Sequence, residues 1–300
     1  MTADPLKGFH FHKDGYDAEA RAGFVSHLLG LMEHAYERGC APDLINVGGG
    51  WRTQNIQDVN QWSHFIDRLE HQVVSRSVTD VWGRDPYGLS LNHKGRIDGR
   101  ERALQKVYTS TYANDIQELF SNTSLRGQSL AQLIRESIFT VLFEPGYALL
   151  QNVGISLTQV ADTKQGSDGR SLVRVNANPY NMSVAKMFEL IADPIHIPRQ
   201  HNHPSTPWSG FIAGNLCLED DLLMRRRVHW NTTPQEGDLL CFLNTAPYFG
   251  QFEDASPILQ PRGQTLVATP PDTGFELFTD DSYYPSHAHT NHQLDLFHLD

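Results

Sequence analysis

Residues 44–47, Leu-Ile-Asn-Val, form a short apolar run that leads directly into three consecutive glycines, Gly48, Gly49 and Gly50. Such a run is typical of a strand buried in a parallel sheet. Glycines at its end let backbone N–H groups approach an anion closely, and a following helix adds its positive dipole end. The pattern predicts a phosphate site at this loop. A tight turn is the alternative, and the spacing of a dinucleotide site is absent.

Strands and helices alternate through the first half of the chain. We expect strands at residues 8–12, 44–47 and 138–143, and helices at 17–38, 62–73 and 129–136. On the first helix, spacings of three and four predict one apolar stripe, made of Phe24, Leu28, Leu31, Met32 and Ala35. The alternation predicts a parallel sheet with covering helices. A sheet that starts at residue 8 leaves a buried-type strand at an edge, which indicates an α/β part that is incomplete at its N-terminal side. A small open sheet covered by residues 77–126 is the alternative.

After residue 150 the sequence becomes rich in short strands. We expect them at residues 153–160, 171–176, 208–212, 238–243 and 264–268, with a helix at 182–191. The sequence therefore predicts an α/β part at residues 1–150, a β domain at 151–275 and a flexible, histidine-rich tail at 276–300.

Charge and cysteine content narrow the possible partners and the compartment. The net charge is −11 and the pI is near 5.7, so nucleic acids and anionic membranes are poor candidate partners. No apolar run reaches the roughly 20 residues of a membrane span, and no signal-peptide pattern opens the sequence. Cys40, Cys217 and Cys241 are few, odd in number and far apart. These features predict a cytoplasmic protein without disulfides.

Three further motifs follow in order along the chain. Phe-Glu-Pro-Gly at residues 143–146 ends an apolar strand, and a carboxylate at a strand's carboxyl end lies where barrel active sites are built. Residues 214–221 read Gly-Asn-Leu-Cys-Leu-Glu-Asp-Asp, and residues 244–248 read Asn-Thr-Ala-Pro-Tyr. Before all of these, Phe-His-Phe-His stands at residues 9–12. Each motif is weak singly, and their order carries the information.

Taken in order over residues 8–268, these motifs resemble the fold-type III pyridoxal-phosphate-dependent decarboxylases, the family of the diaminopimelate, ornithine and arginine enzymes. The diaminopimelate branch is the most similar. The resemblance implies the last three strands of a pyridoxal-phosphate-binding (β/α)8 TIM barrel, followed by a C-terminal β-sandwich or β-barrel domain. It also implies a dimer that acts on an amino acid.

The resemblance assigns a role to each matching residue. His12 would stack on the pyridine ring, Glu144 would bind the ring nitrogen, and Tyr248 would contact the phosphate held by the backbone of Gly48, Gly49 and Gly50. The acidic contact keeps the ring protonated, so that it accepts the electrons left by loss of CO₂. Two further residues match those that complete the partner's active site in the family's dimers, namely Cys217 and Asp221.

The sequence also departs from the family pattern. Tyr147 replaces the arginine expected after Glu-Pro-Gly, Lys13-Asp14-Gly15 replaces Val-Gly-Ser, and Pro247 replaces a small residue. Leu218 stands where relatives often carry an acidic residue that recognises a basic substrate. Between Gly50 and Glu144 lie 93 residues, far more than the roughly 30 of a simple crossover. We therefore expect an insertion at about residues 77–126.

The family's Schiff-base lysine has no counterpart, because none of the six lysines stands in a Y-x-x-K context: Lys7, Lys13, Lys94, Lys106, Lys164 and Lys186. We expect an N-terminally truncated chain that begins at about the sixth barrel strand and is inactive alone. Its function would be α-decarboxylation of an amino acid on pyridoxal 5′-phosphate, as a homodimer or after completion by an N-terminal half.

Two alternatives remain open. A chain without the lysine could be a non-catalytic partner subunit or a pseudoenzyme fragment. His10 with His12, and His201 with His203, each place two imidazoles on one side of a strand, as in metal-dependent barrel hydrolases. Matching acidic ligands are not evident in the sequence, so our prediction includes no metal.

Overall fold

The computed structural model describes residues 6–13, 16–56, 58–83, 86–104, 109–123, 127–182, 192–200, 203, 205–246, 248, 259–269, 276–279 and 282. The chain divides into two compact units, Met1–Glu253 and Asp254–Asp300. In the second unit, β12 (Leu266–Thr269) and β13 (Glu276–Thr279) form an antiparallel pair. No helix among the described residues has the length and apolarity needed to cross a membrane.

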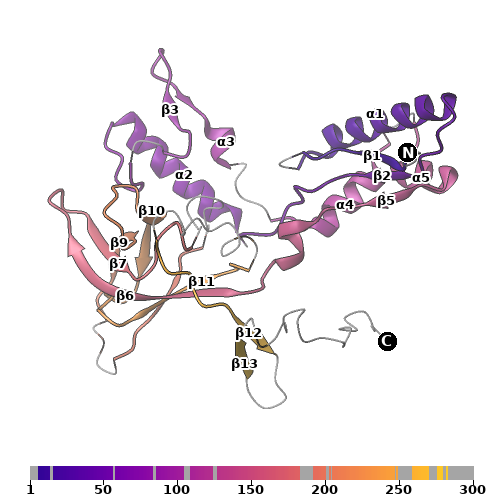
Figure 1. Ribbon diagram of the computed structural model, residues 1–300. Helices are drawn as coiled ribbons and strands as arrows, with labels where there is room; N and C mark the ends of the chain where they lie inside the picture. Colours follow the sequence, from indigo (N-terminus) through magenta and orange to yellow (C-terminus); the bar gives the residue numbers. More distant parts are fainter. Residues whose placement is uncertain are drawn as a thin grey trace. The chain divides into compact units, whose positions relative to one another are not determined.

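Three short parallel strands form the sheet that was expected in the first half of the chain (Figure 1). They are β1 (Gly8–His10), β2 (Leu44–Asn46) and β5 (Thr140–Leu142), in the order β1-β2-β5. The register places Phe9 opposite Ile45, and Ile45 opposite Val141. These three side chains face one apolar core. Since side chains alternate along a strand, the residues between them face the other side of the sheet.

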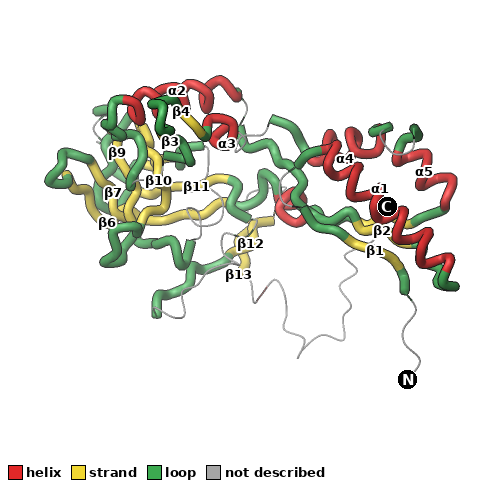
Figure 2. The backbone as a smooth tube through the Cα atoms, turned by 90° about the horizontal axis from the view of Figure 1, so that it is seen from above, coloured by secondary structure: helices red, strands yellow, loops and turns green. Residues whose placement is uncertain are grey.

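Helix α1 (Ala18–Glu37) packs on this core, and Figure 2 shows it together with α4 (Tyr112–Ser121) and α5 (Leu130–Ser137). Asp17 caps its first turn by accepting a hydrogen bond from the Ala20 N–H at 2.9 Å. Gly39 follows its C-terminus at a φ of +78°, as a helix end requires. The buried face of α1 consists of Arg21, Ala22, Val25, Leu28, Leu29, Met32 and Ala35.

The predicted helix at 62–73 is present as α2 (Val59–Val74), but the expectation that it covers the parallel sheet is wrong. Its apolar stripe packs in a separate cluster with α3 (Arg100–Leu104) and with residues near the hairpin of β3 (Ser90–Leu91) and β4 (Ile97–Asp98). The cause is an aromatic contact, because Tyr87 meets the rings of Trp62 and Phe65 edge-on. Helices α4 and α5 take the place on the sheet that was expected for α2.

The second half of the first unit is a six-stranded sheet in the order β10-β9-β7-β6-β11-β8. It is antiparallel except for the β7–β9 pair. A 3₁₀ turn, η1 (Gly146–Leu150), precedes the sheet. Its strands are β6 (Ile155–Gln165), β7 (Ser171–Val175), β8 (Ile195–Ile197), β9 (Trp208–Ala213), β10 (Leu222–Trp230) and β11 (Leu239–Leu243).

Two of these strands, β8 and β10, were not predicted from the sequence. Residues 183–191 of the predicted helix and most of the predicted tail lie outside the described residues. The predicted strand at 264–268 corresponds to β12 of the second unit.

Candidate functional site

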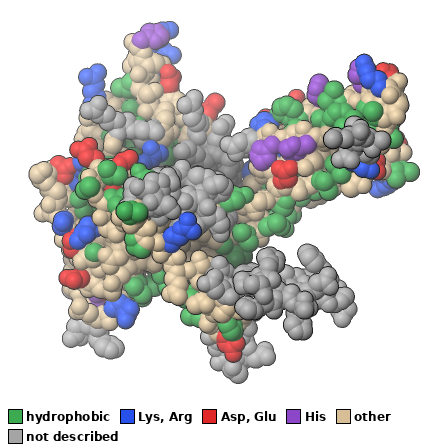
Figure 3. All heavy atoms as spheres, in the orientation of Figure 1, with side chains coloured by type: hydrophobic (Ala, Val, Ile, Leu, Met, Phe, Trp, Pro, Cys, Tyr) green, Lys and Arg blue, Asp and Glu red, His purple; other side chains and the backbone are tan. Residues whose placement is uncertain are grey.

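One face of the three-stranded sheet is open and polar. The register aligns His10 with Asn46 and Leu142 in one row. One step further along the strands, the Glu144 N–H donates to the Gly48 carbonyl at 3.1 Å and continues the pairing. In Figure 3, histidine and carboxylate atoms lie side by side on the surface of this part of the molecule. Phenylalanine and histidine alternate at residues 9–12. Phe9 and Phe11 therefore face the core, and His10 and His12 face the open polar side of the sheet.

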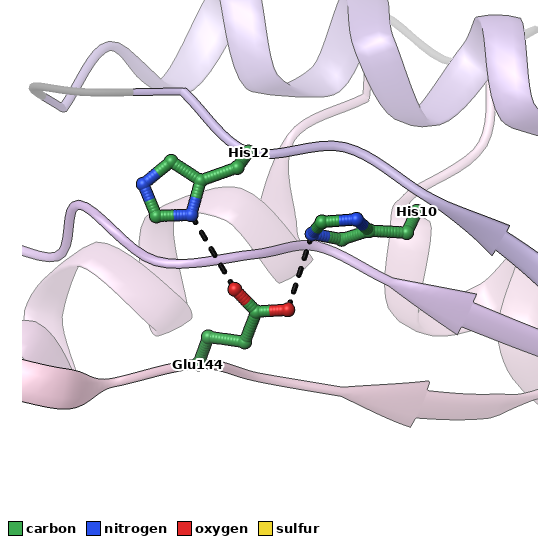
Figure 4. A group of neighbouring side chains, drawn as sticks. All are labelled: His10, His12 and Glu144. Atoms are coloured by element: carbon green, nitrogen blue, oxygen red, sulfur yellow. Dashed lines mark hydrogen bonds and ion pairs between the residues drawn. The ribbon is translucent and has the colours of Figure 1, made fainter.

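The Glu144 carboxylate binds three polar side chains on this face. His10 Nε2 lies 3.1 Å from Oε1, and His12 Nδ1 lies 3.4 Å from Oε2 (Figure 4). The Asn46 amide donates to Oε1 at 2.8 Å. The hydrogen bonds from Asn46 and then from His12 lower the pKa of Glu144 below its ordinary value. Glu144 is therefore an ionised carboxylate at neutral pH, and its side chain is 42% exposed.

The glycines after β2 occupy positions where side chains do not fit. Gly48 has a φ of +68°, and a Cβ there would lie 2.2 Å from the Phe11 carbonyl oxygen. A Cβ on Gly49 would lie 2.7 Å from the Glu144 carbonyl oxygen and 2.8 Å from His12 Cε1. Gly49 thus lies directly against the two residues to which the family resemblance assigned contact with a pyridine ring.

The N–H groups of the three glycines differ in their partners. The Gly48 N–H donates to Asn46 Oδ1 at 2.9 Å, and the Gly49 N–H donates to His12 Nδ1 at 3.4 Å. Within the described part of the chain, the Gly50 N–H has no protein acceptor. The prediction that all three hold a phosphate therefore stays a prediction, and Gly50 is the one of the three whose N–H has no acceptor among the described residues.

Arg21 anchors the same loop from the buried face of α1, and the sequence prediction missed it. Its guanidinium is fully buried and donates to the carbonyls of Val47, Gly49 and Gly50 at 3.2, 2.6 and 3.1 Å. It also lies 4.5 Å from the ring centre of Trp51. The sequence did contain a signal for this role, namely an arginine on the otherwise apolar stripe of the helix. A buried arginine needs several hydrogen-bond acceptors, so its position indicates a contact with polar backbone groups.

An ion pair between Arg52 and Asp115 stabilises the end of the glycine loop. Asp115 is completely buried and accepts hydrogen bonds from the Arg52 backbone N–H at 2.8 Å and from Nε at 2.7 Å. Asp115 belongs to α4, which lies inside the segment that the sequence marked as an insertion. Part of that segment therefore supports the glycine loop directly.

Comparison with known proteins identifies the family of this chain. A family model described as the pyridoxal-dependent decarboxylase, C-terminal sheet domain, matches residues 16–246. The chain belongs to this family. The family resemblance drawn from the order of the motifs is thereby confirmed.

Solved decarboxylases share the fold of this family member. Diaminopimelate decarboxylase from Helicobacter pylori, complexed with L-lysine, aligns with a TM-score of 0.56 at 14% identity, over 91% of this chain and 51% of that one. Arginine decarboxylase of Paramecium bursaria Chlorella virus aligns with a TM-score of 0.55 at 14% identity, over 86% and 54%. The uncharacterized protein y4yA of Sinorhizobium fredii is 24% identical over 243 residues, 80% of this chain and 49% of its own length. The chain thus spans about half the length of the proteins it matches.

Among the decarboxylase motifs, the structure brings Tyr248 to the Glu-Pro-Gly turn. A Cβ on Gly146 would lie 2.4 Å from the Tyr248 hydroxyl, and the rings of Tyr147 and Tyr248 are 6.3 Å apart. Burial raises the pKa of Tyr147, which packs against the core of the six-stranded sheet. Tyr147 therefore fills apolar space where the family has an arginine.

The remaining decarboxylase motif forms a closed loop before β10. Asp221 is 3% exposed, and its Oδ2 accepts a short hydrogen bond, 2.5 Å, from the Leu216 N–H of the same loop. Cys217 is exposed. In this structure Asp221 stabilises its own loop, and the predicted role of Cys217 and Asp221 in a partner's active site stays a prediction.

Proposed function

We propose that this chain supplies the phosphate-binding and ring-binding part of a pyridoxal-phosphate site in an amino-acid decarboxylase. One observation carries the proposal: the glycine at position 49 lets the loop backbone lie directly against the His12 ring and the end of β5, beside the ionised Glu144. An ionised carboxylate beside a glycine loop matches the charge of a protonated pyridine that carries a phosphate. Membership of the pyridoxal-dependent family supports the same chemistry.

The residues present fit this cofactor in three respects. Glu144 would hold a protonated pyridine nitrogen, His12 would lie against the ring, and the Gly50 N–H would bind the phosphate with help from the Tyr248 hydroxyl. When bound, pyridoxal phosphate supplies an electron sink for the carbanion left by CO₂ loss. The task of this chain's residues is to orient the ring and to keep its nitrogen protonated.

We propose an amino acid of the diaminopimelate class as the substrate and a second polypeptide as the source of the lysine. Leu218 is 46% exposed on the loop that the family uses for substrate recognition, so this loop provides no charge for a basic substrate at that position. None of the six lysines has the family's context. We therefore expect no decarboxylation by this chain alone, and activity when an N-terminal half supplies the lysine.

A second candidate function comes from the same residues. His10, His12 and Glu144 place their ligand atoms within 4.8 Å of one another, and two histidines with one carboxylate can hold a divalent metal. This group would support the metal-dependent hydrolase alternative. Its members are exposed and part of a sheet that belongs to a pyridoxal-dependent family, so cofactor binding is the function that we propose.

Calorimetry with pyridoxine 5′-phosphate tests the proposal, because this analogue has the ring and the phosphate but no aldehyde to react with surface lysines. We expect saturable binding at one site, reduced at least ~10-fold by Gly49→Ala, since the added Cβ would lie 2.8 Å from His12 Cε1 and displace that ring. Gly30→Ala is the matched control, because nothing lies within 4 Å of a Cβ at that helical position. Absence of binding, or equal binding by both variants, would refute the cofactor site. Binding of Zn²⁺ in its place, lost in His10→Gln, would favour the metal alternative.

A further inference from the structure

The six-stranded sheet carries a buried group of metal-ligating residues that lies outside the candidate cofactor site. His196 is on β8, His203 follows that strand, and Asp238 immediately precedes β11. The side chains of His196, His203 and Asp238 are 2%, 6% and 0% exposed. Buried imidazoles and carboxylates are rare unless they are paired or bind a metal.

The three side chains converge on one point. His196 Nε2 lies 2.9 Å from Asp238 Oδ2, and His203 Nε2 lies 2.7 Å from the same oxygen. The two imidazole rings are 5.2 Å apart and inclined by 66°, so their Nε2 atoms approach Oδ2 from different directions. Two imidazole nitrogens and one carboxylate oxygen are the donor set that Zn²⁺ and similar divalent ions prefer.

A second layer of contacts orients these donors. Asp238 accepts hydrogen bonds from the Arg199 N–H on Oδ1 at 2.9 Å and from the Gln235 N–H on Oδ2 at 2.8 Å. These two backbone donors fix the orientation of the carboxylate, as contacts behind a metal ligand do.

Thr232 lies behind His196. Its hydroxyl oxygen is 2.7 Å from Nδ1, on the side of the ring that faces away from Asp238. A metal-binding imidazole commonly donates its other N–H to such an acceptor, which fixes the tautomer. A hydroxyl can donate or accept, so Thr232 accommodates His196 with the proton on either nitrogen.

We propose that His196, His203 and Asp238 form a binding site for a divalent transition metal of the Zn²⁺ type. Without the metal, each Nε2–H donates to Asp238. On binding, the proton of each neutral imidazole moves to Nδ1, and the Nε2 lone pair faces the ion. Ligand atoms around tetrahedral zinc are about 3.3 Å apart, so the donors separate by roughly half an ångström. A water molecule takes the fourth position.

Such an ion would stabilise the edge of the six-stranded sheet at β8. Strand β8 has three residues and pairs with β11, with His196 opposite Leu240. The ion links this short strand to the segment that follows it, through His203, and to the turn before β11, through Asp238. The site is independent of pyridoxal phosphate.

Co²⁺ titration of the full chain, without an affinity tag and after metal removal, tests the proposal. We expect one Co²⁺ per chain with the visible absorption of a tetrahedral site, displaced by Zn²⁺, and a higher melting temperature with Zn²⁺. His203→Gln should abolish the band but leave the fold intact, because the glutamine amide can still donate to Asp238. Thr232→Val should weaken the affinity about 10-fold.

A double variant, His10→Gln with His12→Gln, is the matched control, since it removes the exposed histidine pair and leaves the buried site unchanged. This control should keep the tetrahedral band. Either of two results would overturn the proposal: no tetrahedral band in the folded wild-type chain, or a band that survives His203→Gln. Either result would mean that the three residues form a hydrogen-bonded cluster that binds no metal.

Discussion

The Arg21 guanidinium donates a hydrogen bond to the Gly49 carbonyl oxygen at 2.6 Å, and so connects the core of α1 with the glycine loop after β2. The carbonyl oxygens of Val47, Gly49 and Gly50 all accept hydrogen bonds from this guanidinium. Arg21 therefore holds the loop in place through its backbone carbonyls. Its remaining donor, the Gly50 N–H, is then available to a ligand.

The first prediction concerns this contact. Arg21→Met should lower the free energy of unfolding by about 2–4 kcal/mol, since three buried carbonyls lose their donor. It should also weaken binding of pyridoxine 5′-phosphate at least ~10-fold. Urea denaturation and calorimetry measure the two effects. Arg38→Met, at an exposed position at the end of the same helix, should change neither; equal behaviour of the two variants would refute a role for Arg21 in the loop.

The second prediction concerns protonation of Glu144. Its folded-state pKa is depressed, so the stability that the ionised carboxylate contributes is present above the unfolded-state pKa and is lost as the pH falls through the folded-state value. Asn46→Leu removes the first cause of the shift and should raise the pKa of Glu144 toward its ordinary value. Carbon-detected NMR titration of the carboxyl group measures this. An unchanged pKa in Asn46→Leu would show that the Asn46 amide does not hold the carboxylate.

The third prediction separates two roles of Asp221. Burial raises its pKa, so the stability associated with its protonated form is lost as the pH rises through the folded-state value. Asp221→Asn keeps an acceptor for the Leu216 N–H and removes the buried charge, so thermal unfolding near neutral pH should be unchanged or shifted upward. Asp221→Ala should destabilise by about 1–3 kcal/mol. A strongly destabilised Asn variant would mean that the charge itself is required.

The fourth prediction concerns association. Strand β1 lies at one end of its sheet, and the exposed apolar side chains on and near β5 include Ile138 and Leu142, which are 86% and 42% exposed. Exposed edges and apolar side chains promote pairing between chains. We expect the purified chain to sediment as an oligomer, and Ile138→Lys with Leu142→Lys to shift it toward the monomer. A monomeric wild-type chain that unfolds cooperatively would contradict this expectation.

The apolar patterns and the order of the motifs in the sequence were sufficient to predict the three parallel strands and the family. These features depend on local patterns, namely apolar strands that end in glycine or in Glu-Pro-Gly. The position of α2 could not be predicted this way, because its amphipathic stripe is satisfied equally well by a sheet and by the aromatic cluster around Tyr87.

Strand β10 was missed for a related reason. Arg225, Arg226 and Arg227 interrupt its apolar pattern, and three adjacent charges argue against a buried strand. In the structure Arg226 is nearly buried and forms an ion pair with Asp193, more than 30 residues away in sequence. Likewise, the convergence of His196 and Asp238 depends on the pairing of β8 with β11, which no local pattern reveals.

Val81 forms a β-bridge with Arg226, the Trp82 N–H donates to the Arg225 carbonyl at 2.7 Å, and the Trp82 ring packs edge-on against Phe211 at 5.3 Å. The segment before β3 is therefore part of the packing of the six-stranded sheet, although the chain returns to the three-stranded sheet in between. A chimera that exchanged residues 151–246 alone between two members of this family would leave both Trp82 and the surface of β9 and β10 without their native contacts. The exchangeable module is discontinuous, and it would have to carry residues 59–104 along with the sheet.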